Sequence, residues 1–205
     1  MYRFRPSAAL LIAGVTSMQY RKVTNDFPIL LVENFCVPDA ELKAGLMEVV
    51  LENRQRNRRM EAGFNFLIDR DYRHFFAILY NKFLKCAFEI FPGIRLLPTN
   101  SANVWSYVSN GDDHAPDDFF HNHLRSATIN AVYYLNVPSS ATLENGSISF
   151  LLRDNTFAYK PNNFDLLLFP SYLDHKISYL DDSDYRVSIN MEILCDKVPM
   201  DGWQA

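Results

Sequence analysis

The sequence predicts an α+β protein with an all-β core and helices packed against it. Residues 1–94 contain two long patterns with apolar side chains at helical spacing, and the chain after residue 94 contains six short runs rich in β-branched and aromatic side chains. No helical pattern separates these runs, which is typical of an antiparallel sandwich or barrel. With no internal repeat or linker, we expect one domain, 1–205, in which a strand-helix region at 1–94 supports a β-core at 95–195.

The supporting region is predicted to contain one strand and two helices. The apolar run 28–35 is strand-like, and Pro38 with Asp39 then begins a helix. That helix ends in a basic stretch, Arg54 to Arg59, which we interpret as a solvated helix end. A second helix is expected over 72–91, where Pro92-Gly93 stops it; its apolar stripe consists of Phe75, Phe76, Leu79, Phe83, Leu84 and Phe88.

The β-core is predicted from strand-like runs separated by Gly, Pro, Asn, Asp and Ser. The runs are 103–108, 127–137, 147–152, 164–169, 175–180 and 186–194. Because consecutive short strands pair antiparallel across tight turns, we expect the runs to form a closed or two-layered β structure.

Composition excludes several classes of function. The chain has 20 Lys and Arg against 24 Asp and Glu, a net charge of −4, so a general nucleic-acid-binding surface is not expected. Its seven glycines are too scattered for a dinucleotide fingerprint or a P-loop. No stretch approaches the ~20 apolar residues of a membrane helix.

Cysteine usage and the start of the chain bear on localisation. Cys36, Cys86 and Cys195 are odd in number and far apart, which is typical of buried reduced thiols in a cytoplasmic protein. The apolar run 8–15 follows two arginines, as in a secretory signal, but the run is short and residues 16–19 make a poor cleavage site. We therefore expect a surface strand or a loosely held leader here, in a cytoplasmic protein.

Three histidines are placed to form a metal site. His121 and His123 are two residues apart, so on a strand their rings share one face, and His175 begins another strand after a sharp turn. Three imidazoles from two strand ends can cap one face of a metal and leave the opposite positions open. The remaining two differ: His74 is expected on a helix surface, and His114 falls in a polar loop.

Arg186 on the last predicted strand is a candidate anion-binding residue. Alternation along the last strand puts Arg186, Ser188 and Asn190 on one face. If that face points into a barrel, the guanidinium needs an anion, which a carboxylate held in a forked pair would supply. If the face points outward, the same residues are merely solvated, and alternation alone does not decide between the two.

The motifs between Ser101 and Asn190 follow a characteristic order. They are His121-Asn-His123, a strand with Thr128 and Tyr133-Tyr-Leu, a hairpin at Gly146, Phe169-Pro-Ser before His175, and Arg186-Val-Ser188. This order resembles the 2-oxoglutarate- and Fe(II)-dependent oxygenases. It is closest to an uncharacterised group of them with a His-x-His motif, a Tyr-Tyr strand and a Phe-Pro-Ser segment.

The resemblance implies a fold, an activity and a set of site residues. The fold would be a double-stranded β-helix, a jelly-roll or cupin-like form. The activity would be a dioxygenase that hydroxylates an unidentified small molecule or protein side chain with O2, Fe(II) and 2-oxoglutarate. His121 and His175 would be iron ligands, and Arg186 with Ser188 would hold the far carboxylate of 2-oxoglutarate.

One position departs from the family pattern. His123 stands where the family has Asp or Glu, so the third ligand would be His123 itself, or the anion would come from Asp117 or Asp118. Two other functions stay open. One is a cupin-like three-histidine metal enzyme without 2-oxoglutarate, and the other is a non-catalytic jelly-roll binding module. The sequence predicts neither the substrate nor the oligomeric state.

Overall fold

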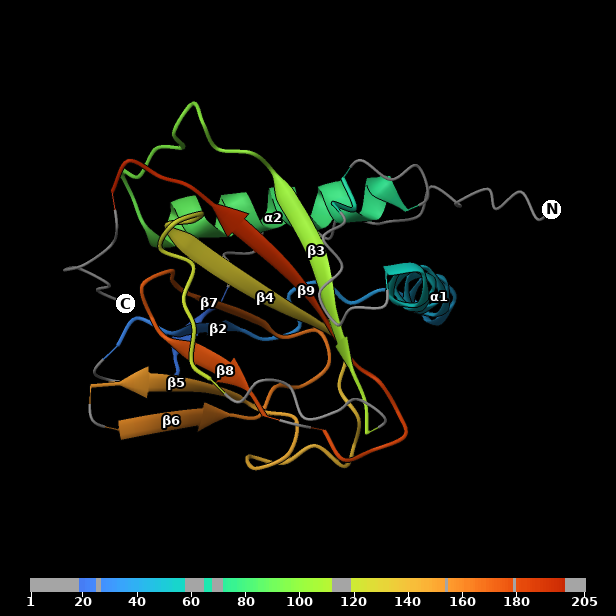
Figure 1. Cartoon of the computed structure of the whole chain (residues 1–205). Coiled ribbons are helices and arrows are strands. Elements are labelled where there is room, and N and C mark those ends of the chain that lie inside the picture. Colours follow the sequence, from blue (N-terminus) through green and yellow to red (C-terminus); the bar gives the residue numbers. More distant parts are fainter. Residues whose placement is uncertain are drawn as a thin grey trace.

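The computed structural model describes residues 19–24, 27–57, 65–67, 72–111, 119–153, 155–178 and 180–197. Two antiparallel sheets face each other in this part of the chain (Figure 1). The major sheet has the strand order β1-β2-β7-β4-β9-β3, and the minor sheet has the order β6-β5-β8. The crossovers between the sheets are those of a jelly roll, so the predicted α+β class with an all-β core is confirmed.

The strand bounds follow the predicted runs closely. The major sheet contains β1 (Arg21–Lys22), β2 (Leu30–Val32), β3 (Asn103–Ser109), β4 (Ile129–Asn136), β7 (Leu166–Pro170) and β9 (Arg186–Ile193). The minor sheet contains β5 (Ile148–Leu152), β6 (Asn155–Tyr159) and β8 (His175–Ile177). The strands predicted over 28–35 and 175–180 are shorter than expected, and β1 and β6 were not predicted.

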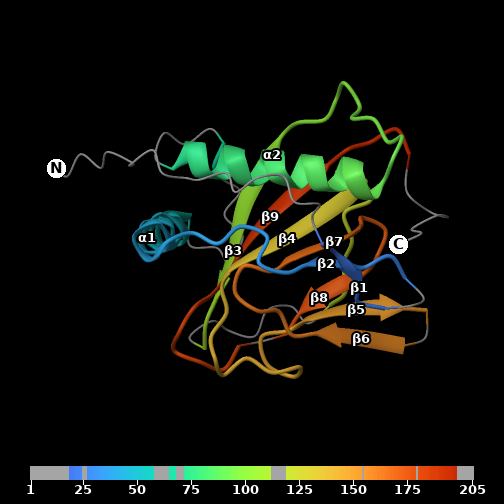
Figure 2. The ribbon, with the colours of Figure 1, turned by 180° about the vertical axis from the view of Figure 1, so that it is seen from behind.

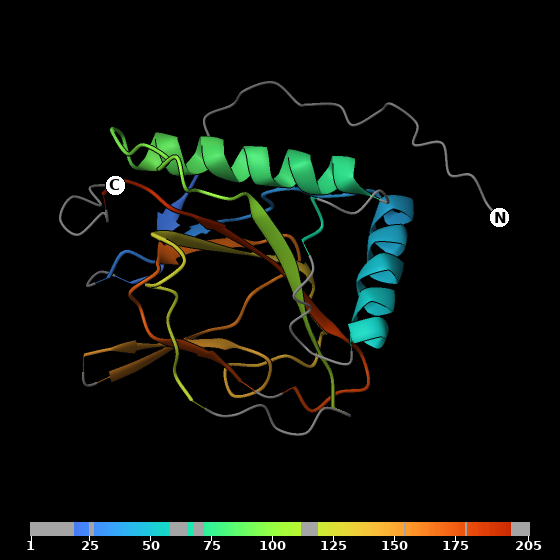
Figure 3. The ribbon, with the colours of Figure 1, turned by 45° about the horizontal axis from the view of Figure 1, so that its top comes forward.

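Two helices cover the outside of the major sheet. α1 (Ala40–Asn57) begins where Asp39 caps it, since Asp39 Oδ1 accepts a 2.8 Å hydrogen bond from the Leu42 backbone N–H. α2 (Arg73–Ile90) lies across the sheet on the side away from the minor sheet (Figures 2 and 3). Neither helix in the described part of the chain combines the length and apolar character needed to cross a bilayer.

Side-chain alternation divides the core into two layers. Tyr133 belongs to the outer layer, which packs under α2, whereas its neighbours Val132 and Tyr134 belong to the inner layer between the sheets. Tyr134 is directly opposite Ser188 in the ladder of β4 and β9, and paired residues share a face. The row that begins at Arg186 therefore points into the space between the sheets, which decides the alternative left open by the sequence.

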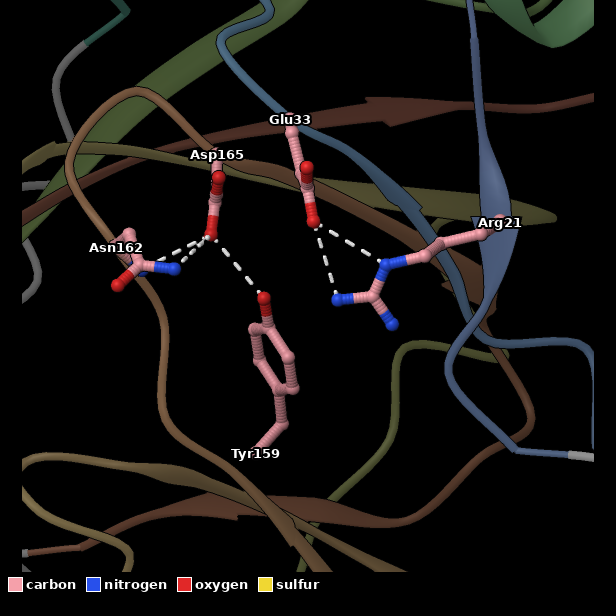
Figure 4. A network of polar contacts seen from close by, with 5 residues as sticks. All are labelled: Arg21, Glu33, Tyr159, Asn162 and Asp165. Atoms are coloured by element: carbon pink, nitrogen blue, oxygen red, sulfur yellow. Dashed lines mark hydrogen bonds and ion pairs between the residues drawn. The ribbon is translucent and has the colours of Figure 1, made fainter.

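A buried carboxyl group joins the two sheets at one corner (Figure 4). Asp165, 3% exposed, precedes β7 and accepts hydrogen bonds from the Tyr159 hydroxyl of β6 at 3.1 Å and from the Asn162 backbone N–H at 2.9 Å. The nearby Arg21–Glu33 ion pair, at 3.2 Å, has both side chains 58% exposed, so it contributes little to stability. Asp165 is thus the member of this network that fixes the corner.

Candidate metal centre

The structure brings His121, His123 and His175 together at one end of the space between the sheets. One nitrogen from each ring lies within 4.8 Å of the others. Their ring centres are 4.6 Å apart for His121 and His175, 5.2 Å for His123 and His175, and 5.3 Å for His121 and His123. Among the described residues, this is the one cluster of three His, Cys, Asp or Glu side chains that could hold a metal ion.

Backbone hydrogen bonds hold the cluster in place. His121 and His175 form an antiparallel bridge, in which each backbone N–H donates to the other residue's carbonyl at 3.0 and 2.8 Å. His123 donates its backbone N–H to the Ser171 carbonyl at 3.0 Å, and the Ser171 hydroxyl donates to Asn130 Oδ1 at 3.1 Å. The Pro-Ser turn before β8 therefore anchors His123, while β8 itself carries His175.

His175 is the most enclosed of the three. It is 6% exposed, and its ring lies 4.9 Å from the Phe169 ring and 6.1 Å from the Phe150 ring, centre to centre. This burial lowers the pKa of His175 to about 3, an effect only partly offset by the hydrogen bond between its Nδ1 and the Leu173 carbonyl. The imidazole is therefore neutral at pH 7, with its Nε2 lone pair free to bind a metal.

His123 contacts a residue that sequence reasoning missed. Its Nδ1 lies 2.8 Å from Glu192 Oε1, and both side chains are largely buried. Glu192 is on β9, directly opposite Asn130 of β4. The signal was present in the sequence, because the alternation of Arg186, Ser188 and Asn190 continues to Glu192, but nothing in the sequence indicated which histidine would lie above it.

Arg186 is fully buried on the inner face of the major sheet. It has 0% exposure, and none of its three guanidinium nitrogens has a hydrogen-bond partner within the described residues. Its guanidinium carbon lies 5.2 Å from the centre of the Tyr134 ring. Gly146, at φ 77°, lies beside the Arg186 stem, where a Cβ would be 3.9 Å from Arg186 Cδ. Such a charge is costly to bury alone, and an anion beside it would offset that cost.

Other polar groups without partners lie along the same inward-facing row, from Arg186 toward the end of β9 that carries Glu192. The hydroxyls of Tyr134 and Ser188 and the amide nitrogens of Asn130 and Asn190 are buried without partners in the described structure. Burial raises the pKa of Tyr134 to about 12, although the Arg186 charge acts in the opposite direction. Tyr134 is therefore a neutral hydrogen-bond donor at pH 7. Of these groups, the hydroxyls of Tyr134 and Ser188 lie nearest Arg186, and a ligand that accepts hydrogen bonds would give all three residues partners.

The remaining predicted residues lie elsewhere. His74 is exposed on α2, as expected. His114, Asp117 and Asp118 fall outside the described residues, as do residues 1–18. Within the described part of the chain, Glu192 is the carboxylate that contacts the histidine cluster.

The residues present could hold a metal ion and a carboxylate group. Three imidazole nitrogens suit a divalent first-row metal, and at roughly 2.1 Å from each nitrogen an ion held on one face by three donors has them about 3 Å apart. The ring nitrogens lie within 4.8 Å of one another here, so the rings would turn inward to hold the ion. The orphaned guanidinium of Arg186 and the free hydroxyls of Tyr134 and Ser188 match a carboxylate.

Comparison with solved structures places this fold among known ones. A prolyl 4-hydroxylase from Phytophthora capsici aligns with a TM-score of 0.61 and 14% identity over 84% of this chain and 60% of its own. A prolyl hydroxylase from Trichoplax adhaerens, in complex with a hypoxia-inducible-factor oxygen-degradation-domain peptide, aligns with a TM-score of 0.61 and 14% identity over 81% and 83% of the two chains. The chain has the fold of the prolyl hydroxylases.

A third structure supports the same conclusion. The Pseudomonas putida prolyl-4-hydroxylase aligns with a TM-score of 0.54 and 15% identity, covering 82% of this chain and 92% of that one. No family model matches the sequence. No curated protein matches it. The double-stranded β-helix implied by the sequence resemblance is thus confirmed at the level of the fold.

Proposed function

We propose that this protein is an Fe(II)- and 2-oxoglutarate-dependent dioxygenase that hydroxylates a carbon of a small molecule or a protein side chain. The observation that carries the proposal is the placement of the buried, unpartnered Arg186 on the same inner face that leads to the histidine cluster. A metal site alone leaves Arg186 unexplained, and an anion pocket alone leaves the three histidines unexplained.

His121, His123 and His175 are the proposed metal ligands. Two of them have Nδ1 occupied, His123 by Glu192 and His175 by the Leu173 carbonyl, so Nε2 of each would be the atom that holds a metal. Phe150 and Phe169 close one side of the cluster and keep water from His175. Three ligands on one side leave the other positions of an octahedral ion open for co-substrate and O2.

Arg186, Ser188 and Tyr134 are the proposed residues that hold the co-substrate. Arg186 would donate to the far carboxylate of 2-oxoglutarate, and the two hydroxyls would add neutral hydrogen bonds. With iron bound, the chemistry supplied is that one O2 converts 2-oxoglutarate to succinate and CO2 and places the second oxygen atom on the substrate carbon. The protein's own contribution is to position these reactants and exclude water.

One observation favours a second function. The cluster contains three histidines and no direct carboxylate among the described residues, which is also the donor set of cupin-like metal enzymes that use no 2-oxoglutarate. Arg186 separates the two functions, because only the first requires a dicarboxylate co-substrate.

Anaerobic calorimetry and a turnover assay test the proposal. We expect the protein to bind one Fe(II), then to bind 2-oxoglutarate, and to release succinate in air. His175→Ala should abolish iron binding, and Arg186→Ala should abolish 2-oxoglutarate binding while iron still binds. His74→Ala, at an exposed histidine on α2, is the matched control and should change neither. Iron binding that is unchanged in His175→Ala would contradict the assignment, and binding of iron without 2-oxoglutarate would favour the cupin-like enzyme.

A further inference from the structure

Glu192 holds a distinctive position relative to the histidine cluster. Its Oε1 lies 2.8 Å from His123 Nδ1, with 14% and 21% of the two side chains exposed. His175, by comparison, directs its Nδ1 to the neutral carbonyl of Leu173 at 3.0 Å. One histidine of the cluster is therefore bonded to a formal negative charge, and another to an uncharged acceptor.

The sheet fixes where this carboxylate lies. Glu192 pairs with Asn130 on β4 and with Asn103 on β3, so strands flank it on both sides. It is the fourth member of the inward row that begins at Arg186. Tyr80 of α2 also donates its hydroxyl to the Glu192 carbonyl at 3.4 Å, which ties the backbone to the helix above. The carboxylate thus reaches the cluster from a rigid strand.

This contact has two chemical consequences for His123. An acceptor at Nδ1 holds the proton there and leaves the Nε2 lone pair directed at the metal, and a charged acceptor makes the imidazole a more basic ligand. Three neutral imidazoles would leave the full charge of a divalent metal uncompensated. The Glu192 carboxylate, which contacts His123 and not the metal, restores a negative charge to the site.

We propose that Glu192 is a positioning residue that acts through His123. By contacting this ligand rather than the metal, it supplies the negative charge that the three histidines of the metal site do not carry. The proposal rests on the metal site of the proposed function, but not on 2-oxoglutarate. Glu192 does not touch the metal in this arrangement, so its effect should vanish when His123 is removed.

Anaerobic titration of the full chain with Fe(II), and with Co(II) as a spectroscopic probe, tests whether Glu192 acts on the metal through His123. Wild type, Glu192→Gln, His123→Ala and the double variant form a mutant cycle. We expect Glu192→Gln to weaken metal binding by about 10- to 100-fold and to shift the Co(II) absorption bands. In the His123→Ala background, titrated with Co(II) at concentrations high enough to fill the weakened site, the same substitution should change neither the Kd nor the spectrum. Glu192→Asp should recover part of the affinity.

Controls separate this effect from bulk charge and from misfolding. Glu89→Gln removes one exposed carboxylate on α2 and should leave the metal Kd unchanged. Unfolding of each variant in chelator shows whether the fold is intact before metal is added. Equal losses from Glu192→Gln with and without His123 would overturn the proposal, because Glu192 would then be a direct ligand. An unchanged Kd in Glu192→Gln would also overturn it.

Failure of this inference is distinguishable from failure of the proposed function. A coupled Glu192 and His123 in a protein that binds metal but not 2-oxoglutarate would support the inference and refute the dioxygenase. Normal binding of metal and 2-oxoglutarate, with no coupling between Glu192 and His123, would support the dioxygenase and refute the inference. Wild-type protein that binds no metal would overturn both.

Discussion

The guanidinium of Arg186 lies over the ring of Tyr134, 5.2 Å from its centre, on the inner face of the major sheet. The cation–π contact stabilises the guanidinium in part, but its nitrogens still lack hydrogen-bond partners among the described residues. A buried charge left in this condition costs stability, and proteins retain such a cost where a ligand offsets it. The two residues can therefore be tested separately for stability and for binding.

Replacing Arg186 with Met should stabilise the protein without ligand and abolish its response to 2-oxoglutarate. Methionine fills a similar volume without an unpaired charge, so we expect the free energy of unfolding to rise by about 1–4 kcal/mol. Thermal unfolding with and without 2-oxoglutarate and metal measures both effects. An Arg186→Met variant that is destabilised yet still stabilised by 2-oxoglutarate would contradict this account.

Replacing Tyr134 with Phe should weaken 2-oxoglutarate binding and leave stability nearly unchanged. Its hydroxyl makes no hydrogen bond of good geometry in the described structure, so little is lost in the free protein, whereas a hydrogen bond to a carboxylate is worth about 1.5–3 kcal/mol. The expected loss of affinity is roughly tenfold or more. Calorimetric titration with 2-oxoglutarate measures it.

The adjacent Tyr133 is the matched control. It faces the other side of the sheet, where its hydroxyl donates to the Cys36 carbonyl at 2.5 Å. Tyr133→Phe should therefore lower the free energy of unfolding by about 1 kcal/mol, because a buried carbonyl loses its donor, and should leave 2-oxoglutarate binding intact. If Tyr133→Phe weakened 2-oxoglutarate binding and Tyr134→Phe lowered only the free energy of unfolding, the inner and outer faces of β4 would be reversed.

Most of the β-core could be predicted from sequence, because its strands are rich in β-branched and aromatic residues and are bounded by turn residues. β4 is buried at all but its last residue, and a run of that kind is unmistakable. β6 was missed for the opposite reason. Asn155–Tyr159 is an edge strand with no fully buried residue, so no hydrophobic pattern distinguishes it from a loop.

The candidate site shows a similar division. Spacing indicated that His121 and His123 share a face, and the bridge between His121 and His175 explains why His175 joins them. The partner of His123 depends on how the histidine segment crosses the end of β9, which is a tertiary relationship. Sequence alternation grouped Arg186, Ser188 and Asn190 on one face, but the sequence reasoning did not extend that row to Glu192 or connect it with His123.

The three cysteines should react slowly in the native protein. All are free and buried, and desolvation raises the pKa of Cys86 to about 12 and of Cys195 to about 11; that of Cys36 is also raised. Because the thiolate is the reactive form, a disulfide reagent at pH 8 should modify three thiols rapidly only after unfolding in guanidinium. Rapid modification of any one of them in the native state would show that it is exposed.

The corner carboxyl of Asp165 should make stability depend on pH. Burial raises its pKa above the usual range, more than the hydrogen bonds from Asn162 and Tyr159 lower it. The folded state therefore holds the Asp165 proton to higher pH than the unfolded chain does. Its contribution to the free energy of unfolding is full below about pH 4 and is lost as pH rises through the folded pKa.

Asp165→Asn keeps this position neutral at every pH, and its amide oxygen can still accept from Tyr159. We expect the stability of the variant relative to wild type to increase with pH from 4 upward and then to level off. Urea unfolding at several pH values between 4 and 8 measures the difference, with exposed Asp181→Asn as a control that should show no such trend. A difference that does not vary with pH, or that falls as pH rises, would show that the hydrogen bonds outweigh burial at this corner.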